Sequence, residues 1–151
     1  MPTLKDRLRA DLTAAMKARD ETRTRTLRMA LTSISNEEVS GTAAHDLTDD
    51  EITRILAREA KRRREAATAF ADAGRGDQAA AERAEEDVLA SYLPAQLSDD
   101  ELTAIVAAAI AETGASGPGG MGRVMKVVTP RVAGRAEGSR VAALVRSQLA
   151  G

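Results

Sequence analysis

The stretch SYLPAQLSDDEL (Ser91–Leu102) decides how the chain is organised, because it ends one helix and begins another. Pro94 cannot continue a helix, and its ring biases the residue before it away from helical backbone angles. Ser98 is a good N-cap, and Glu101 follows at the three-residue spacing of a capping box. We therefore place a domain boundary near residue 94.

Residues 1–93, before this boundary, carry apolar residues at the three- and four-residue spacing of amphipathic helices. Thr48 is a good N-cap and Glu51 completes a capping box, so a long helix should run to about Ala73, where Gly74 ends it. Four helices are expected in this N-terminal domain, beginning after Thr3, at about Asp20 and Glu21, after Thr48, and at about Asp77, with the last ending at Tyr92.

Residues 94–151, after the boundary, are expected to form a small three-helix domain. One helix follows Ser98. A short one covers Met121–Thr129, where Pro130 stops it, and the last covers Glu137–Leu149. No stretch shows the alternation of apolar and polar residues that is typical of strands. The predicted fold class is therefore all-α, with about four helices followed by three.

Composition narrows the class of protein further. Hydrophobic residues make up 43% of the 151 residues, but many are alanine, and only Phe70 and Tyr92 are aromatic. Such a core buries little area per residue, so we expect long helices packed through alanine or burial against a partner. The absence of cysteine excludes disulfides, thiolate catalysis and cysteine zinc sites. Without a signal-peptide pattern or an apolar run of about 18 residues, we expect a soluble cytoplasmic protein with no membrane partner.

Charge is unevenly distributed along the chain, although the net charge is only −1. Residues 1–36 hold eight Lys or Arg against four Asp or Glu, and residues 117–151 hold six against one. Residues 77–113 hold one basic residue against nine acidic ones. The basic ends can steer the protein toward a polyanion, or they can pack beside the acidic middle of the same molecule, and charge alone leaves both open.

Four features carry weaker signals. His45 is the only histidine and has no neighbour at metal-ligand spacing, so we expect a solvated loop residue and no metal site. The DDE triplets at 49–51 and 99–101 follow helix caps, where acidic residues stabilise a helix start, so we assign them no acid–base catalysis.

The four side chains of KRRR at 61–64 point in all directions around a helix axis, which favours a solvated, salt-bridged helix, with RNA contact as the alternative. GPGGMG at 117–122 lacks the Lys-Ser/Thr of a P-loop, although the helix it opens can offer N–H groups to a phosphate.

Basic residues near the C-terminus are the best candidates for a functional site, here nucleic-acid binding: Arg123, Lys126, Arg131, Arg135, Arg140 and Arg146. Because aromatic residues are almost absent, base stacking cannot dominate binding. Phosphate contacts and shape would have to supply the affinity, which suits a folded RNA better than a single strand. The alternative is a soluble surface without a ligand.

Three segments resemble the GatB/YqeY family, in particular its free-standing YqeY-like proteins: AMKARD with LRMAL near the start, YLPAQLSDDEL in the middle, and MGRVMKVVTPRVAGRAEGSRVAALV near the end. The similarity covers Leu4 to Leu149. It implies a helical N-terminal part and a three-helix part similar to the tail domain of the B subunit of glutamine-dependent aspartyl/glutamyl-tRNA amidotransferase, a domain associated with tRNA recognition. One departure is Glu137, where relatives tend to have Asp. Glu is a poorer N-cap, and Ser139 could serve instead.

The residues and the resemblance together support two functional hypotheses. The first is a non-catalytic tRNA-binding accessory protein related to the amidotransferase tail. The second is a protein-interaction module that docks on an aminoacyl-tRNA synthetase or an amidotransferase. We rank an enzyme last: the family's labels mention a carbon–nitrogen ligase with glutamine as nitrogen donor, but the sequence supplies no amidase nucleophile, ATP site or metal site. We therefore expect no catalytic residues and no cofactor, and the oligomeric state stays open.

Overall fold

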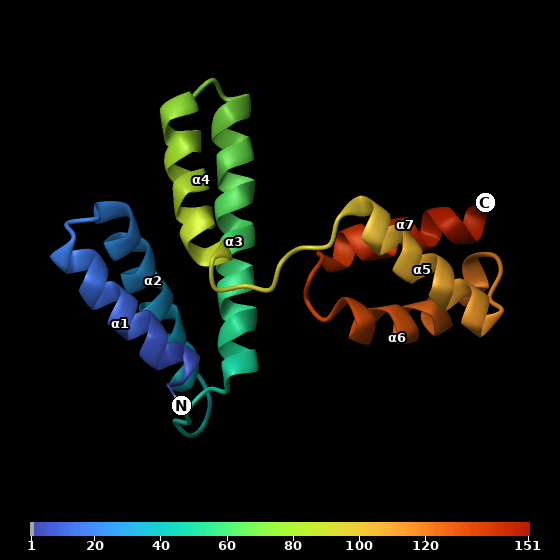
Figure 1. Ribbon diagram of the computed structural model, residues 1–151, viewed down its shortest axis with the longest axis horizontal. Helices are drawn as coiled ribbons and strands as arrows, with labels where there is room; N and C mark the ends of the chain where they lie inside the picture. The colour runs from blue at the N-terminus through green and yellow to red at the C-terminus, as the bar shows by residue number, and fades with distance from the viewer. Residues whose placement is uncertain (1) are drawn as a thin grey trace. The chain divides into compact units, whose positions relative to one another are not determined.

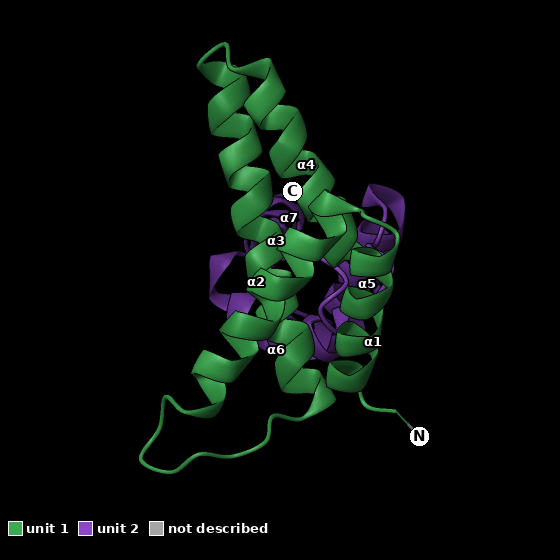
Figure 2. Ribbon diagram, turned by 90° about the vertical axis from the view of Figure 1, so that its left-hand side faces the viewer, with its two compact units in different colours: residues 1–93 green, residues 94–151 purple. Residues whose placement is uncertain are grey.

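The computed structural model describes residues 2–151 and is all-helical, as the sequence predicts (Figure 1). This range contains seven α-helices and one short 3-10 helix, and none of its residues lies in a strand. The chain divides into two compact units, unit 1 (residues 1–93) and unit 2 (residues 94–151), which Figure 2 distinguishes by colour. Within residues 2–151, no helix is long and apolar enough to cross a membrane.

Unit 1 consists of two helical hairpins (Figure 1). One pairs α1 (Leu4–Lys17) with α2 (Glu21–Glu38), and the other pairs α3 (Asp49–Asp72) with α4 (Gly76–Ala90). Contacts of α2 with both α3 and α4 join the two hairpins. The second hairpin therefore supplies the surface against which the first one buries its apolar stripe.

Helix starts in unit 1 follow the predicted caps. Thr3 begins α1 with a complete capping box, in which Asp6 accepts the reciprocal hydrogen bond. Thr48 begins α3 and accepts a hydrogen bond from the Glu51 backbone N–H at 3.2 Å. The reciprocal hydrogen bond of the predicted Thr48–Glu51 capping box, from the Thr48 N–H to the Glu51 carboxylate, does not form. The Glu51 carboxylate instead lies near the His45 ring, 3.9 Å from Nε2.

Tyr92 fastens the end of unit 1 to its first helix. It follows α4, which ends at Ala90 rather than at Tyr92 as predicted, and its hydroxyl donates a hydrogen bond to Asp11 of α1. Burial, reinforced by this hydrogen bond to a carboxylate, raises the pKa of Tyr92 to about 12. The ring packs beside the buried core of unit 1, which comprises Leu8, Leu27, Ala30, Ile34, Ile52, Ile55, Leu56, Ala60, Val88 and Leu89.

Unit 2 packs α5 (Asp99–Thr113), α6 (Met121–Val132) and α7 (Gly138–Ala150) around a core of valine and leucine. A 3-10 helix at Pro118–Gly120 leads into α6. The largest fully buried side chains of this core are Leu102, Val106, Val124, Val128 and Val145.

The prediction that Pro130 stops α6 is wrong, because the helix continues to Val132. Proline removes one N–H donor and its ring crowds the carbonyl four residues earlier. Both effects fall near the end of α6, where little of the helix remains to be disrupted. The helix ends instead at Ala133 and Gly134, which are left-handed with φ of 48° and 77°.

The start of α7 has no side-chain cap. Glu137 occupies the N-cap position without making a cap hydrogen bond, in line with the weak N-cap preference of glutamate. Ser139 lies inside the helix, so the suggestion that it caps α7 in place of Glu137 is wrong. Backbone hydrogen bonding alone closes the first turn, from the Val141 N–H to the Glu137 carbonyl oxygen at 3.0 Å.

The predicted capping box of α5 is complete. Ser98 Oγ accepts a hydrogen bond from the Glu101 N–H at 3.1 Å, and the Glu101 carboxylate accepts one from the Ser98 N–H at 3.2 Å. These hydrogen bonds from Ser98 hold the pKa of Glu101 below its ordinary value of 4.5, because they favour the charged form.

Unit 2 should therefore lose stability in acid partly through Glu101. A carboxyl group whose pKa is lower in the folded state stabilises the fold above the unfolded value of 4.5, and this contribution disappears as the pH falls through the folded value. Glu101→Gln keeps the acceptor but cannot titrate. Its urea midpoint, read from the Met121 methyl signal, should fall less than that of the wild type between about pH 6 and about pH 3. Equal falls in both proteins would contradict this assignment.

Candidate nucleic-acid interface

Two of the predicted basic residues share the exposed side of α6. Val124, Val128 and Val132 form the buried side of this helix. Arg123 and Lys126 are exposed and three positions apart, so they are neighbours on the side turned away from the core. The Lys126 side chain makes no hydrogen bond or ion pair with any residue of the described range. We call Arg123 and Lys126 the α6 row.

Arg131 also lies on α6 but points about 80° away from Arg123 and about 140° away from Lys126 around the helix axis, and it pairs with an acidic residue. Its Nη2 is 2.5 Å from the Glu112 carboxylate of α5, and the two side chains are 43% and 54% exposed. An exposed pair of this kind contributes about 0.2–1 kcal/mol, because water screens both charges. A phosphate oxygen can therefore replace Glu112 as the partner of Arg131 at small cost. Arg123 is engaged still more weakly, by one contact of 3.5 Å from Nη1 to the Thr113 carbonyl oxygen.

Arg135 and Arg140 are used within unit 2. Arg135 Nε donates a hydrogen bond to the Ala95 carbonyl oxygen at 2.9 Å. Arg140 donates to the Leu97 carbonyl oxygen at 3.1 Å and to Asp99 at 2.6 Å. Together they hold residues 95–99 against the α6–α7 connection and the start of α7. Their positions in the sequence do not reveal this role, because each contact spans about 40 residues of chain.

Arg146 is the sixth predicted residue and lies on the exposed side of α7. The Arg146 side chain makes no ion pair or hydrogen bond within residues 2–151. Since it stands six positions after Arg140, the two side chains point in directions about 120° apart around the helix. The structure thus places Arg123, Lys126 and Arg131 on α6 and engages Arg135 and Arg140 with residues 95–99. It leaves Arg146 on a separate helix.

The glycine-rich segment before α6 is shaped by packing. Gly120 is buried, and a Cβ added to it would lie 2.7 Å from the Ala115 Cβ, closer than two non-bonded carbon atoms can approach. Gly117 has a φ of 68°, which favours glycine. The turn itself therefore accounts for Gly117 and Gly120 without a bound phosphate, whereas Gly119 and Gly122 have nothing within 4 Å of an added Cβ and no structural explanation.

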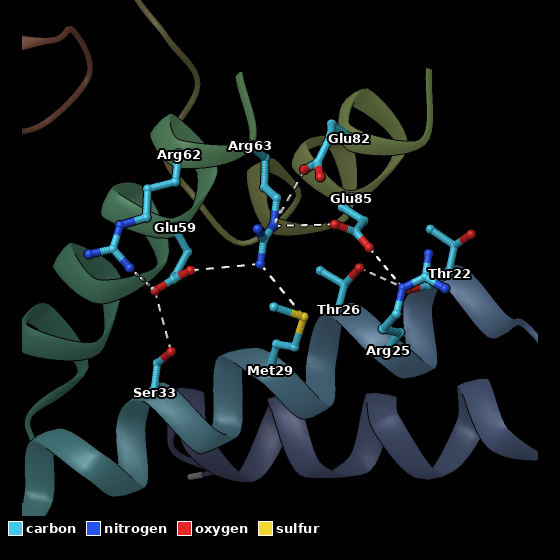
Figure 3. Close-up of polar contacts among 10 residues, drawn as sticks. All are labelled: Thr22, Arg25, Thr26, Met29, Ser33, Glu59, Arg62, Arg63, Glu82 and Glu85. Carbon is cyan, nitrogen blue, oxygen red and sulfur yellow. Dashed lines mark hydrogen bonds and ion pairs between the residues drawn. The ribbon is translucent and has the colours of Figure 1, made fainter. Parts of the chain in front are cut away.

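A group of charged side chains in unit 1, all but Arg25 largely buried, was not predicted from the sequence (Figure 3). Arg63 of α3 lies 3.3 Å from Glu85 of α4 and 3.9 Å from both Glu59 and Glu82. Arg25 of α2 donates a hydrogen bond to Glu85 at 2.9 Å. We call these five residues the ion cluster. Only the Glu59–Arg63 pair follows from sequence spacing, since the other contacts join different helices.

Arg63 therefore departs from the solvated helix expected for KRRR. Its side chain is only 17% exposed, whereas that of Arg62 next to it is 64% exposed. Arg64 pairs with Glu86 of α4 at 2.9 Å. The basic run thus serves in part to hold α3 against α4.

The remaining candidates stay isolated. His45 is exposed, with the Glu51 carboxylate 3.9 Å away as its one ion-pair contact in the described part of the chain. The DDE triplets lie in the first turns of α3 and α5. No group of three potential metal ligands is assembled among residues 2–151.

These features describe an all-helical protein of two units, whose candidate site is a charged helix surface. The family model for YqeY-like proteins matches residues 5–149, and the chain belongs to this family. No curated protein matches its sequence.

Proposed function

We propose that this protein binds tRNA through unit 2 as an accessory factor without catalytic activity. The observation that carries the proposal is the α6 row, Arg123 and Lys126, with Arg131 on another side of the same helix. All three side chains are exposed, and the one ion pair among them, to Glu112, is open to solvent on both sides. A phosphate backbone can therefore contact them without displacing any buried group.

The chemistry of unit 2 supports contact with phosphates rather than with bases. Both aromatic residues of the chain, Phe70 and Tyr92, lie in unit 1, so unit 2 has no aromatic side chain on which a base can stack. Affinity would then come from charge and shape, which suits a folded RNA. The choice of tRNA is supported by the resemblance of the three-helix part, residues 94–151, to the amidotransferase tail domain. Binding of tRNA would imply a role in translation and a cytoplasmic location for the protein.

Salt dependence is the direct test of this proposal. With about three phosphate contacts, the logarithm of the tRNA affinity should fall with the logarithm of salt concentration with a slope of about −2 to −3. Arg123→Ala/Lys126→Ala should weaken binding about tenfold at low salt and make that slope shallower by about 2. Filter binding of labelled total tRNA, at about 50 and 200 mM salt, measures both quantities.

Arg54→Ala/Arg58→Ala is the matched control, because both residues are exposed on α3 and their side chains make no hydrogen bond or ion pair within the described range. This control removes the same charge and should bind tRNA as the wild type does. Arg135 and Arg140 are unsuitable for the test, since their removal would also release residues 95–99. Absence of tRNA binding at micromolar wild-type protein and low salt would overturn the proposal, as would equal losses in the two double variants.

A further inference from the structure

A groove in unit 1 combines exposed thioether and guanidinium groups. It lies between the end of α1 and the first half of α2 and has a volume of about 640 Å³. Its lining is apolar at Met16 and Met29 and cationic at Arg19, Arg25 and Arg28, and it also includes Thr24 and one acidic residue, Glu21. We call it the Met–Arg groove, and it shares no residue with the α6 row.

The apolar part of the groove is open to solvent. Met16 and Met29 are each 43% exposed, and they are two of the three large hydrophobic residues that are exposed in the described part of the chain. Methionine is flexible and polarisable, so a methionine surface adapts to apolar side chains of different shapes. Two such residues in one groove provide a place where an apolar side chain of a partner can leave water.

The cationic part of the groove has unused hydrogen-bonding capacity. Arg28 Nη2 contacts only the Met16 sulfur, at 3.2 Å, and sulfur is a weak acceptor. The Arg19 guanidinium has no hydrogen-bond or ion-pair partner within residues 2–151, and only its backbone N–H is engaged, by the Met16 carbonyl oxygen at 3.2 Å. Arg25 is held by Glu85 on one side, yet its side chain remains 55% exposed. Guanidinium groups bind carboxylates in pairs of parallel hydrogen bonds. The lining holds three arginines against the single carboxylate of Glu21, so its excess positive charge is complementary to acidic side chains.

The ion cluster holds one wall of the groove in place. Arg25 belongs to both features, and Arg63 Nη2 contacts the Met29 sulfur at 3.6 Å from the inner side of α2 (Figure 3). The wall is thus ordered before any partner arrives, which lowers the entropy lost on binding.

Arg19 occupies an unusual backbone conformation. Its φ is 58°, in the left-handed region that favours glycine, and Arg19 and Ala133 are the only non-glycine residues with positive φ in the described range. A glycine would satisfy this turn with less strain. The arginine side chain is therefore not explained by the turn, and it borders the groove.

We propose that the Met–Arg groove docks an acidic amphipathic helix of a partner protein. Apolar side chains of that helix lie between Met16 and Met29, and its flanking carboxylates pair with Arg19 and Arg28. The thioether lining favours a protein over an RNA, since a phosphate backbone has no apolar side chain to bury there. The inference gives a location to the protein-interaction hypothesis and does not depend on tRNA binding by unit 2.

Methyl NMR tests this inference. The chain has five methionines, and in methyl-labelled protein Met16 and Met29 report on the groove while Met121 and Met125 report on unit 2. The probe is a 16-residue helical peptide with a leucine stripe flanked by glutamates. Three further probes are the same peptide with glutamine for glutamate, the same peptide with lysine for glutamate, and a 16-nucleotide RNA. We expect the acidic peptide alone to shift the Met16 and Met29 signals, and the shifts to shrink as salt is raised.

Two variants separate docking from folding. Arg19→Glu/Arg28→Glu should weaken binding of the acidic peptide at least roughly tenfold, because it replaces attraction by repulsion. Arg54→Glu/Arg58→Glu on α3 makes the same charge change outside the groove and should bind as the wild type does. Arg19→Gly should weaken binding while its unfolding midpoint stays the same or rises, since glycine suits the left-handed turn.

Three outcomes would overturn the inference. The first is no shift of Met16 or Met29 with the acidic peptide, and the second is an equal shift with the glutamine peptide or with the RNA. The third is a shift of Met16 and Met29 that grows with the concentration of the protein alone, which would identify a second copy of the chain as the occupant.

Discussion

Arg63→Met is expected to destabilise unit 1 by about 3 kcal/mol, because it removes the cation that three carboxylates share. Glu59, Glu82 and Glu85 have side chains only 12%, 22% and 10% exposed, so water cannot replace the lost charge fully. Losses of about 3–5 kcal/mol are typical when one partner of a buried pair is removed. The lower end applies here, since Arg62 remains 3.3 Å from Glu59 and Arg25 remains 2.9 Å from Glu85.

Urea unfolding followed by tyrosine fluorescence measures this loss, because Tyr92 is the only tyrosine and lies in unit 1. The chain contains no tryptophan whose emission would mask the tyrosine signal. Arg62→Met is the matched control and should cost less than about 0.5 kcal/mol, as its side chain is 64% exposed. Arg63→Met combined with Glu85→Gln should recover part of the loss by removing one of the repelling charges. An Arg63→Met protein as stable as the Arg62→Met protein would show that the ion cluster does not stabilise unit 1.

Gly120→Ala is the second large effect, and we expect it to destabilise unit 2 by about 2 kcal/mol. The added Cβ would lie 2.7 Å from the Ala115 Cβ and 3.4 Å from its Cα, in a turn where both residues are buried. Protein interiors are packed tightly enough that such an overlap must be relieved by moving backbone. The start of α6 would shift, and the Val124 side chain with it.

Gly122→Ala provides the control for this prediction. Nothing lies within 4 Å of a Cβ at Gly122, and the residue is in α6, so alanine there should be neutral or stabilise by up to about 1 kcal/mol. The swap Ala115→Gly/Gly120→Ala moves the methyl group across the contact and should recover part of the lost stability. Urea midpoints from the Met121 and Met125 methyl signals report on unit 2 alone. If Gly120→Ala instead lowered tRNA affinity without changing the midpoint, the glycine would act on the ligand and the packing explanation would fail.

Much of the fold was predictable from local signals. Thr3, Thr48 and Ser98 begin helices as expected, because a cap acts on N–H groups within three residues of itself. Pro130 shows the limit of such signals, since its effect depends on how close it lies to the end of the helix. That end is decided by Ala133 and Gly134, which turn the chain toward α7.

The candidate site was less predictable, because exposure and pairing depend on distant residues. Arg123, Lys126 and Arg140 were equivalent candidates in the sequence. In the folded chain Arg140 contacts Leu97 and Asp99, whereas Lys126 faces solvent. The ion cluster was missed for the same reason, since only one of its pairs lies within a single helix.

By itself, the sequence determined the helical class, the places where most helices begin, and the interruption at Pro94. Each of these depends on interactions among residues a few positions apart, which the order of residues specifies directly. Only the tertiary structure decided which arginines remain available to a ligand. A guanidinium group takes the carboxylate or carbonyl oxygen that packing brings within about 3 Å, and packing joins segments that lie far apart in the chain.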